Sequence, residues 1–108
     1  MSEKAFQTKI IKALKERGAF VFKHEGHFVG GIPDLIGCYN GWFVAMEVKK
    51  SESEARKNTG PIARQKHTLR QINGCHGLGY IVYPENFDEV MNDLDQRCVR
   101  RFSTALPL

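Results

Sequence analysis

Two acidic residues, Asp34 and Glu47, stand on either side of a sequence pattern that predicts a tight β-hairpin. Two apolar runs are joined by Asn40-Gly41, a dipeptide that favours a type I′ turn because both central residues adopt positive φ there. If the loop consists of these two residues alone, Asp34 lies directly opposite Glu47, with Cβ atoms roughly 4.5–5.5 Å apart. Lys49 follows Glu47 by two positions and projects from the same face. The pattern thus gathers two carboxylates and one ammonium at the open end of the hairpin.

Like charges placed directly opposite each other on a sheet repel, so this arrangement favours a cation between the two acids. Carboxylate oxygens without converging thiolates or imidazoles suit Mg²⁺ or Mn²⁺ as the bound ion. The structural alternative is a salt-bridge network in which Lys49 neutralises Asp34 and Glu47 without any metal.

A third acidic residue lies on the apolar side of the first expected helix. The pattern over 2–17 predicts this helix, with Ser2 as its cap. At 100° per residue, Glu3 lies within about 20° of Ile10 and Leu14. A carboxylate in this position either stabilises the positive helix N-terminus or points toward the cation site.

Gln65 occupies a similar place on the second expected helix, 61–73. It falls on the inward stripe of that helix, about 40° from Leu69. Taken alone, this glutamine is a boundary residue that hydrogen-bonds to backbone. Beside a cation site, it becomes a candidate for holding Lys49 or a substrate group.

The remaining periodicity predicts one α/β domain, a mixed sheet with helices packed against it. The expected elements are helix 2–17, strands 19–24, 34–39 and 42–49, a mobile polar loop 50–60, helix 61–73, strand 78–83 and an acidic helix 86–96. The chain lacks a long apolar run and the apolar stretch of a signal peptide, so a cytoplasmic protein without a membrane partner is expected. Its three cysteines match no zinc framework and are expected to be reduced and mostly buried.

Charge is unevenly distributed along the 108 residues. Residues 1–83 contain 13 Lys or Arg against 7 Asp or Glu, residues 84–96 none against 5, and residues 97–108 contain 3 against none. The basic main body favours a phosphate backbone as a partner, although a solvated mixed surface is the plainer explanation. The residues expected to form a DNA-contacting rim beside the site are Arg56, Lys57, Arg64, Lys66 and Arg70.

These residues in this order resemble the PD-(D/E)xK nuclease superfamily, and more narrowly its small stand-alone VRR-NUC type of phages and bacteria. The resemblance is carried by Glu3 on the first helix, Gly31-Ile-Pro-Asp34, Glu47-Val-Lys49, and Gln65 on the following helix. It implies a restriction-endonuclease-like αβββαβ core with an additional C-terminal helix. The corresponding boundaries are a single nuclease domain over 1–96 and a basic tail over 97–108.

The resemblance also implies roles for individual residues. The implied ligands of a Mg²⁺ or Mn²⁺ ion are Asp34, Glu47, the backbone carbonyl of Val48 and, through water, Glu3. Lys49 would orient or help to deprotonate the attacking water. Gln65 would hold Lys49 or the scissile phosphate.

The activity implied by the resemblance is that of a metal-dependent, structure-selective DNA endonuclease. Its expected substrates are branched DNAs such as Holliday junctions, cut by a homodimer. The alternative is a non-catalytic DNA-binding module of the same fold in a replication, repair or packaging complex. His24-Glu25-Gly26-His27 has one spacer residue too few for the zinc-protease helix motif, although His24 or Glu25 could line the nuclease site.

Overall fold

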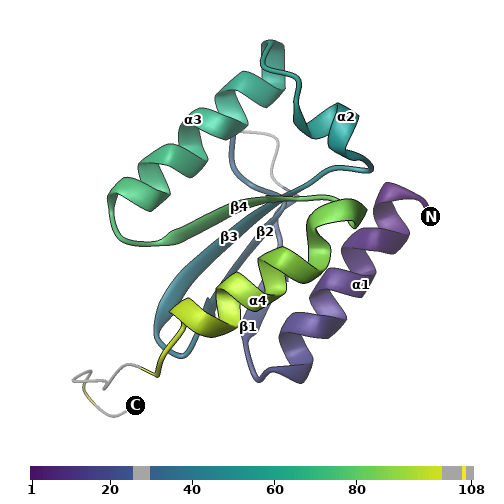
Figure 1. The fold of residues 1–108 in the computed structure, drawn as a ribbon. Helices are drawn as coiled ribbons and strands as arrows, with labels where there is room; N and C mark the ends of the chain where they lie inside the picture. The colour runs from purple at the N-terminus through teal and green to yellow at the C-terminus, as the bar shows by residue number, and fades with distance from the viewer. Residues whose placement is uncertain (26–29, 101–105, 107–108) are drawn as a thin grey trace.

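The computed structural model describes residues 1–25, 30–100 and 106 of the chain. They form an α/β structure in which a four-stranded mixed sheet carries helices on both faces (Figure 1). In chain order the elements are α1 (Glu3–Glu16), β1 (Phe20–Lys23), β2 (Leu35–Tyr39), β3 (Trp42–Val48), α2 (Glu52–Ala55), α3 (Gly60–Gly74), β4 (Leu78–Val82), the 3₁₀ turn η1 (Pro84–Asn86) and α4 (Phe87–Arg97). Within this part of the chain, every helix is too short or too polar to cross a bilayer.

The sheet has the strand order β1-β2-β3-β4. The first three strands pair antiparallel, and β4 pairs parallel to β3 after a crossover that contains α2 and α3. Leu35 pairs with Met46, which confirms the register predicted from a two-residue loop. Asn40 and Gly41 have φ of 52° and 88°, as a type I′ turn requires.

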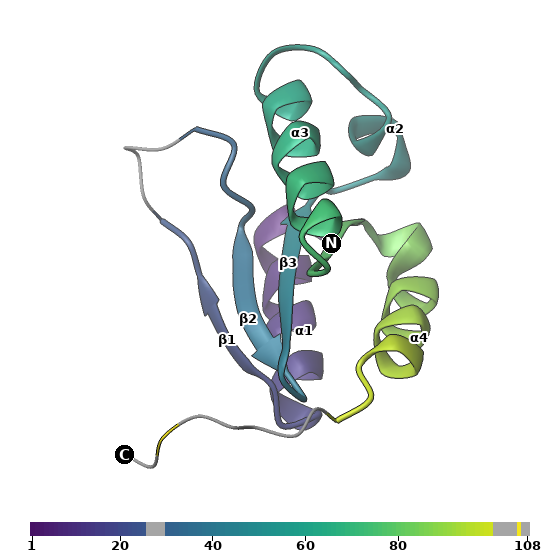
Figure 2. The ribbon, with the colours of Figure 1, turned by 90° about the vertical axis from the view of Figure 1, so that its left-hand side faces the viewer.

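The two faces of the sheet pack against different helices. One face lies against α1 and α4, and its core consists of Phe6, Ile10, Leu14, Leu35, Val44, Met46, Val48, Val82, Val90, Met91, Leu94 and Cys98. The other face meets α3, whose Leu69 is 5% exposed and lies so close to Gly79 that a Cβ there would be 3.0 Å from Leu69 Cδ2. Figure 2 shows α3 lying over β3, with β1 and β2 to one side of it. The second face is therefore covered chiefly over β3 and β4.

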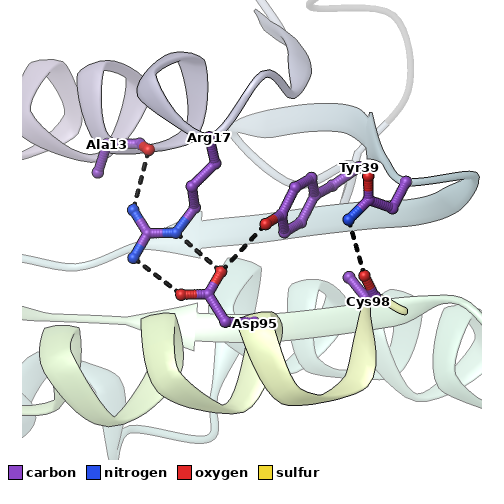
Figure 3. Close-up of polar contacts among 6 residues, drawn as sticks. Ala13, Arg17, Tyr39, Asp95 and Cys98 are labelled. Atoms are coloured by element: carbon purple, nitrogen blue, oxygen red, sulfur yellow. Dashed lines mark hydrogen bonds and ion pairs between the residues drawn. The ribbon is translucent and has the colours of Figure 1, made fainter. Parts of the chain in front are cut away.

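The turn end of the hairpin is fastened to α1 and α4 by polar contacts (Figure 3). Arg17 donates through Nε and Nη2 to the two carboxylate oxygens of Asp95, at 2.9 and 3.1 Å. The Tyr39 hydroxyl donates to the same carboxylate at 3.3 Å. The Asn40 side-chain amide donates to the Cys98 carbonyl at 2.9 Å. These contacts hold the end of the hairpin that lies away from Asp34 and Glu47.

The expected helices and strands are present, and their ends differ from the prediction by no more than one residue. The prediction of an uninterrupted polar loop over 50–60 is wrong, because this segment contains α2. Ser51 caps α2 by accepting a hydrogen bond from the Glu54 backbone N–H at 3.2 Å. Ala55 is the buried anchor of this short helix, at 7% exposure. A single alanine in a polar segment is too weak an apolar signal to reveal a helix.

The prediction that the cysteines are mostly buried is wrong for two of the three. Cys98 is buried, whereas Cys38 and Cys75 are exposed. Cys38 projects from the sheet face that α3 covers only in part. Strand periodicity assigns a residue to a face, but it does not show whether a helix covers that position.

Candidate active site

Asp34 and Glu47 lie side by side where the hairpin strands end. Asp34 comes directly before β2, and Glu47 is the penultimate residue of β3. Asp34 Oδ2 accepts a hydrogen bond from the Val48 backbone N–H at 2.9 Å, which fixes its carboxylate against the neighbouring strand. The Asp34 carboxylate lies close enough to Glu47 to raise the pKa of that side chain. The structure thus brings the two predicted acids together.

Glu47 is a buried carboxylate that lacks a full set of partners. Its side chain is 2% exposed, and its Oε2 atom has no hydrogen-bond partner among the residues described. Two neighbouring carboxylates repel each other unless one of them carries a proton or a cation lies between them. Burial, followed by the neighbouring Asp34, raises the pKa of Glu47 from 4.5 to about 9. A proton or a cation therefore accompanies this pair at neutral pH.

Lys49 brings a positive charge to the same face of the sheet. Its Nζ atom lies 3.7 Å from Glu47 Oε1 and donates a hydrogen bond to Gln65 Oε1 at 3.1 Å. Only 15% of the Lys49 side chain is exposed, so Gln65 and the protein wall restrict its ammonium group. The attraction to Lys49 lowers the pKa of Glu47, but burial and Asp34 outweigh this effect.

Glu3 lies at the rim of the site. It is exposed in the first turn of α1, and its negative charge is among the smaller causes that raise the pKa of Glu47. This placement suits contact with the site through water better than direct ligation. Glu3 therefore lies near the site, but it is linked to the site less directly than Gln65, which hydrogen-bonds to Lys49.

The loop before β2 packs against α3, and this packing positions Asp34. Gly31 has a φ of +83°, and a Cβ there would lie 3.0 Å from Thr68 Oγ1 and 3.2 Å from the Arg64 carbonyl oxygen. Only glycine combines this backbone conformation with so close an approach at little cost. On the other side, the His24 backbone N–H donates to the Asp34 carbonyl at 2.7 Å. The acid is thus held between β1 and α3.

The basic residues predicted to contact DNA occupy different environments. Arg56 and Lys57 form ion pairs with the acids of α2, at 2.6 and 3.0 Å. Lys66 Nζ donates to a backbone carbonyl at 2.6 Å. Arg64 and Arg70 are exposed on α3. The more available positive charge of the predicted rim therefore lies on α3.

His24, which the sequence offers as a residue that could line the site, directly follows β1. Its Nε2 atom is buried without a hydrogen-bond partner in the described part of the chain. However, residues 1–25, 30–100 and 106 contain no group of three or more His, Cys, Asp or Glu able to hold a metal. His24 therefore does not complete a ligand set with the two acids, and His27 lies outside the described residues.

The donors at this site suit a hard divalent cation that retains most of its water. Mg²⁺ is usually held through one or two carboxylates and keeps several water ligands. Asp34 and Glu47 supply that number, and the unpartnered Oε2 of Glu47 is the kind of atom that a cation would satisfy. The Val48 carbonyl as a further ligand stays a prediction. The bond from the Val48 N–H to Asp34 was not predicted, since it depends on how the strand ends are staggered.

No model of a protein family, no curated protein and no solved structure matches the chain. The geometry of Asp34, Glu47, Lys49 and Gln65 is therefore the basis on which a function is assigned.

Proposed function

We propose that this protein is a Mg²⁺- or Mn²⁺-dependent endodeoxyribonuclease of the PD-(D/E)xK type, with a restriction-endonuclease-like fold. The observation that supports the proposal most is the buried Glu47 carboxylate, which faces Asp34 and keeps an oxygen without a partner among the described residues. Leaving a buried polar group unsatisfied costs on the order of 1–3 kcal/mol. A chemical role at this position explains why the chain tolerates that cost.

The side chains divide the chemistry between holding a cation and orienting water. Asp34 and Glu47 would hold a divalent cation, which would supply Lewis-acid chemistry that acidifies water and offsets charge on the phosphate. The Lys49 ammonium, 3.7 Å from Glu47, donates to the attacking water or to a non-bridging phosphate oxygen. Gln65 acts as a positioning residue, because its Oε1 atom accepts a hydrogen bond from Lys49 and restricts its rotamers.

The proposed substrate class follows from the position of the basic residues. Arg64 and Arg70 are exposed on α3, and the Arg64 backbone packs against Gly31 in the loop that leads to Asp34. Contacts from such residues to phosphates carry affinity without reading base sequence. We therefore propose selection by DNA shape, with branched DNA such as a four-way junction as substrate.

The experiment that tests this function is incubation with labelled linear duplex, flap and four-way-junction DNA, with and without Mg²⁺ or Mn²⁺. We expect metal-dependent cleavage of the branched substrates and its loss in Glu47→Ala and Lys49→Ala, while DNA binding largely persists. Tight, salt-sensitive binding without metal-dependent products would instead identify a non-catalytic DNA-binding module. Cleavage by Glu47→Ala at the wild-type rate would exclude the proposed site.

A further inference from the structure

The sheet face beside α3 carries the most exposed phenylalanine rings of the described residues. Phe20, Phe22 and Phe43 are 69%, 49% and 46% exposed. Phe20 pairs with Cys38, which in turn pairs with Phe43, so these side chains project from one face of the sheet. In Figure 2 the strands β1 and β2 lie outside the cover of α3. We call this surface the apolar face and define it by Phe20, Phe22, Ile36, Cys38 and Phe43.

The apolar face continues into the candidate active site. Its cross-strand pairs along β1 and β2 are Phe20–Cys38 and Phe22–Ile36. Asp34 comes two residues before Ile36 and therefore projects from the same face. Successive pairs on one face are about 6.6 Å apart, so Phe22 lies one step from the level of Asp34 and Phe20 lies two steps from it. A ligand that follows the two rings is thus directed toward the acids.

α3 forms a basic wall beside the apolar face. The helix contains two arginines, a lysine and a histidine, but no Asp or Glu. Arg64, Thr68 and Gln71 recur at helical spacing on one side of it. Thr68 and Gln71 line, together with Phe43, a groove of about 290 Å³, so this side of α3 borders the apolar face. Arg64 extends the same side toward the loop before β2, where a Cβ on Gly30 would be 3.6 Å from the Arg64 Nε atom.

We propose that the apolar face binds an unpaired strand of DNA, with bases stacked on Phe20 and Phe22 and phosphates along α3. Sites for single-stranded nucleic acid combine aromatic rings, on which successive bases stack, with a positively charged groove that follows the backbone. The apolar face supplies the rings, and the acid-free helix beside it supplies the charge. The two kinds of contact lie next to each other, as one strand requires.

The spacing of the rings does not suit paired DNA. Successive bases in one strand of a duplex are about 3.4 Å apart, whereas the ring centroids of Phe20 and Phe22 are 6.1 Å apart and their planes are tilted by 58°. Paired bases also present only their edges in the grooves. An unpaired strand has free base faces and can spread its bases onto separate rings. The ligand that fits is therefore single-stranded.

The area of the apolar face favours this occupant over a protein. At about 200 Å² for a phenylalanine side chain, the three rings expose roughly 300 Å² in total. One partner in a standard protein interface contributes about 800 Å², which is more than twice as much. A stacked base needs only one face of one ring. The charge of α3 also requires a negatively charged partner, and every nucleotide of a DNA strand brings a phosphate.

The groove at Phe43 offers a place for a further base. Its lining is uncharged and consists of Phe43, Thr68, Gln71, Ile72, Cys75 and Gly77. Its volume of about 290 Å³ lies at the lower end of the range of small-molecule sites, so it suits one planar ring system. The Thr68 hydroxyl and the Gln71 amide can each donate and accept hydrogen bonds at the edge of a base.

The path of the strand beyond the rings rests on the proposed function. If Asp34 and Glu47 form a nuclease site, the unpaired arm of a branched DNA lies on the apolar face and its branch point reaches the acids. Binding of the arm itself requires no cleavage. Stacking and catalysis can therefore be measured separately.

The test is the binding of a labelled oligo(dT) of about 16 nucleotides, followed by fluorescence anisotropy in EDTA so that no metal-dependent cleavage occurs. We expect Phe20→Ala and Phe22→Ala each to weaken binding at least about tenfold. Phe22→Tyr keeps an aromatic ring and should bind like the wild type. Val99→Ala is the matched control, because Val99 is 69% exposed, as is Phe20, and lies outside the apolar face. Circular dichroism checks that each variant is folded.

Two results of this titration would overturn the proposal. One is an affinity equal to that of the wild type in both alanine variants. The other is the absence of oligo(dT) binding by the wild type, which would leave the apolar face to a protein partner.

An abasic strand of the same length separates stacking from charge, because it keeps the phosphates and lacks the bases. We expect the wild type to bind it at least about tenfold more weakly than oligo(dT). Phe22→Ala should leave the dependence of affinity on salt unchanged, whereas Arg64→Ala should reduce the slope of log affinity against log salt by roughly 0.7. An abasic strand bound as tightly as oligo(dT) would overturn the proposal.

These outcomes are distinguishable from those of the nuclease assignment. Ring-dependent binding of oligo(dT) without metal-dependent cleavage of any DNA would support the apolar face as a binding site and refute the nuclease. Metal-dependent cleavage with unchanged binding in the phenylalanine variants would refute the stacking site alone.

Discussion

Asp95 and Glu47 are two carboxylates that each lie close to a cation, but their surroundings differ. Asp95 is on α4, where Arg17 donates to both of its oxygens at 2.9 and 3.1 Å and Tyr39 adds a third hydrogen bond (Figure 3). Its side chain is 42% exposed. Glu47 is 2% exposed, and its nearest cation is 3.7 Å away.

The difference separates a structural carboxylate from one available for chemistry. Asp95 has its hydrogen-bonding capacity met by the protein and by solvent, so it ties α1, the hairpin and α4 together. Glu47 is buried and lies beside Asp34. Both of these raise the pKa of Glu47, and neither supplies a hydrogen-bond donor to its carboxylate. A bound cation would satisfy Glu47, whereas Asp95 has no need of one.

The largest effect that distinguishes the two carboxylates is on DNA cleavage. We expect Glu47→Gln to reduce the metal-dependent rate by about 1,000-fold or more, since under the proposed function it removes a charged ligand of the metal ion. We expect Asp95→Asn to keep a rate close to that of the wild type, because its contacts lie at the other end of the hairpin. Single-turnover cleavage of the preferred branched substrate measures both. Equal losses in the two variants would remove the distinction.

The second largest effect is on stability. Here Glu47→Gln is expected to improve on the wild type, although it reduces cleavage. In the absence of metal, unfolding between pH 4.5 and 9 releases a proton from Glu47, because its pKa is about 9 in the folded protein and 4.5 in its ordinary range. The unfolded state then binds fewer protons, so the free energy of unfolding falls as pH rises through this window. Glu47→Gln removes this pH-dependent loss of stability. We expect the free energy of unfolding of the variant to exceed that of the wild type by roughly 1–3 kcal/mol near the upper end of this pH range.

Urea denaturation in EDTA at several pH values measures this stability difference. The difference in the free energy of unfolding between Glu47→Gln and the wild type should grow as pH increases. For Asp95→Asn, the free energy of unfolding should change with pH in parallel with that of the wild type. Parallel curves for Glu47→Gln and the wild type would show that Glu47 ionises normally in the folded state.

Gln65 is expected to have an intermediate effect, through Lys49. Gln65→Ala removes the acceptor 3.1 Å from Lys49 Nζ, and we expect kcat to fall about tenfold with little change in KM, since the ammonium loses its position. Gln71→Ala is the control, because Gln71 is exposed on the same helix. Rescue of kcat by Gln65→Glu, which restores an acceptor, would support positioning. If kcat fell by the same factor in Gln71→Ala, this would indicate a general disturbance of α3.

The smallest effect is on the Arg17–Asp95 contact. Both side chains are partly exposed, 28% and 42%, and exposed ion pairs contribute at most about 1 kcal/mol. We therefore expect Asp95→Asn to lower the free energy of unfolding by less than about 1 kcal/mol, with cleavage unchanged. A chemical denaturation series checks this value. A loss of several kcal/mol would mean that the turn end of the hairpin is held more tightly than its exposure suggests.

Most of the fold could be predicted from the sequence because its signals are local. Asn40-Gly41 specifies a turn whose geometry sets the register of β2 and β3, and apolar spacing marks α1, α3 and α4. The short helix α2 was missed because Ala55 alone carries its apolar signal. The exposure of Phe20 and Cys38 could not be predicted either, since alternation along a strand does not show where a neighbouring helix stops.

The site could be predicted in part for the same reason. The position of Asp34 opposite Glu47 follows from counting residues away from the turn, and Gln65 follows from helical spacing relative to Leu69. The burial of Glu47, the unpartnered Oε2 atom and the bond from the Val48 N–H to Asp34 depend on how α3 and the strand ends pack. These features come from tertiary structure, which no local pattern encodes.

The measurement that tests the central claim most directly is calorimetric titration of Mn²⁺ into the wild-type protein, Asp34→Asn, Glu47→Gln and Asp95→Asn. If Asp34 and Glu47 hold a divalent cation, the wild type and Asp95→Asn bind Mn²⁺ with the same affinity, and Asp34→Asn and Glu47→Gln bind at least tenfold more weakly. Mn²⁺ binding of undiminished affinity in Glu47→Gln, or no binding by the wild type, would contradict the account.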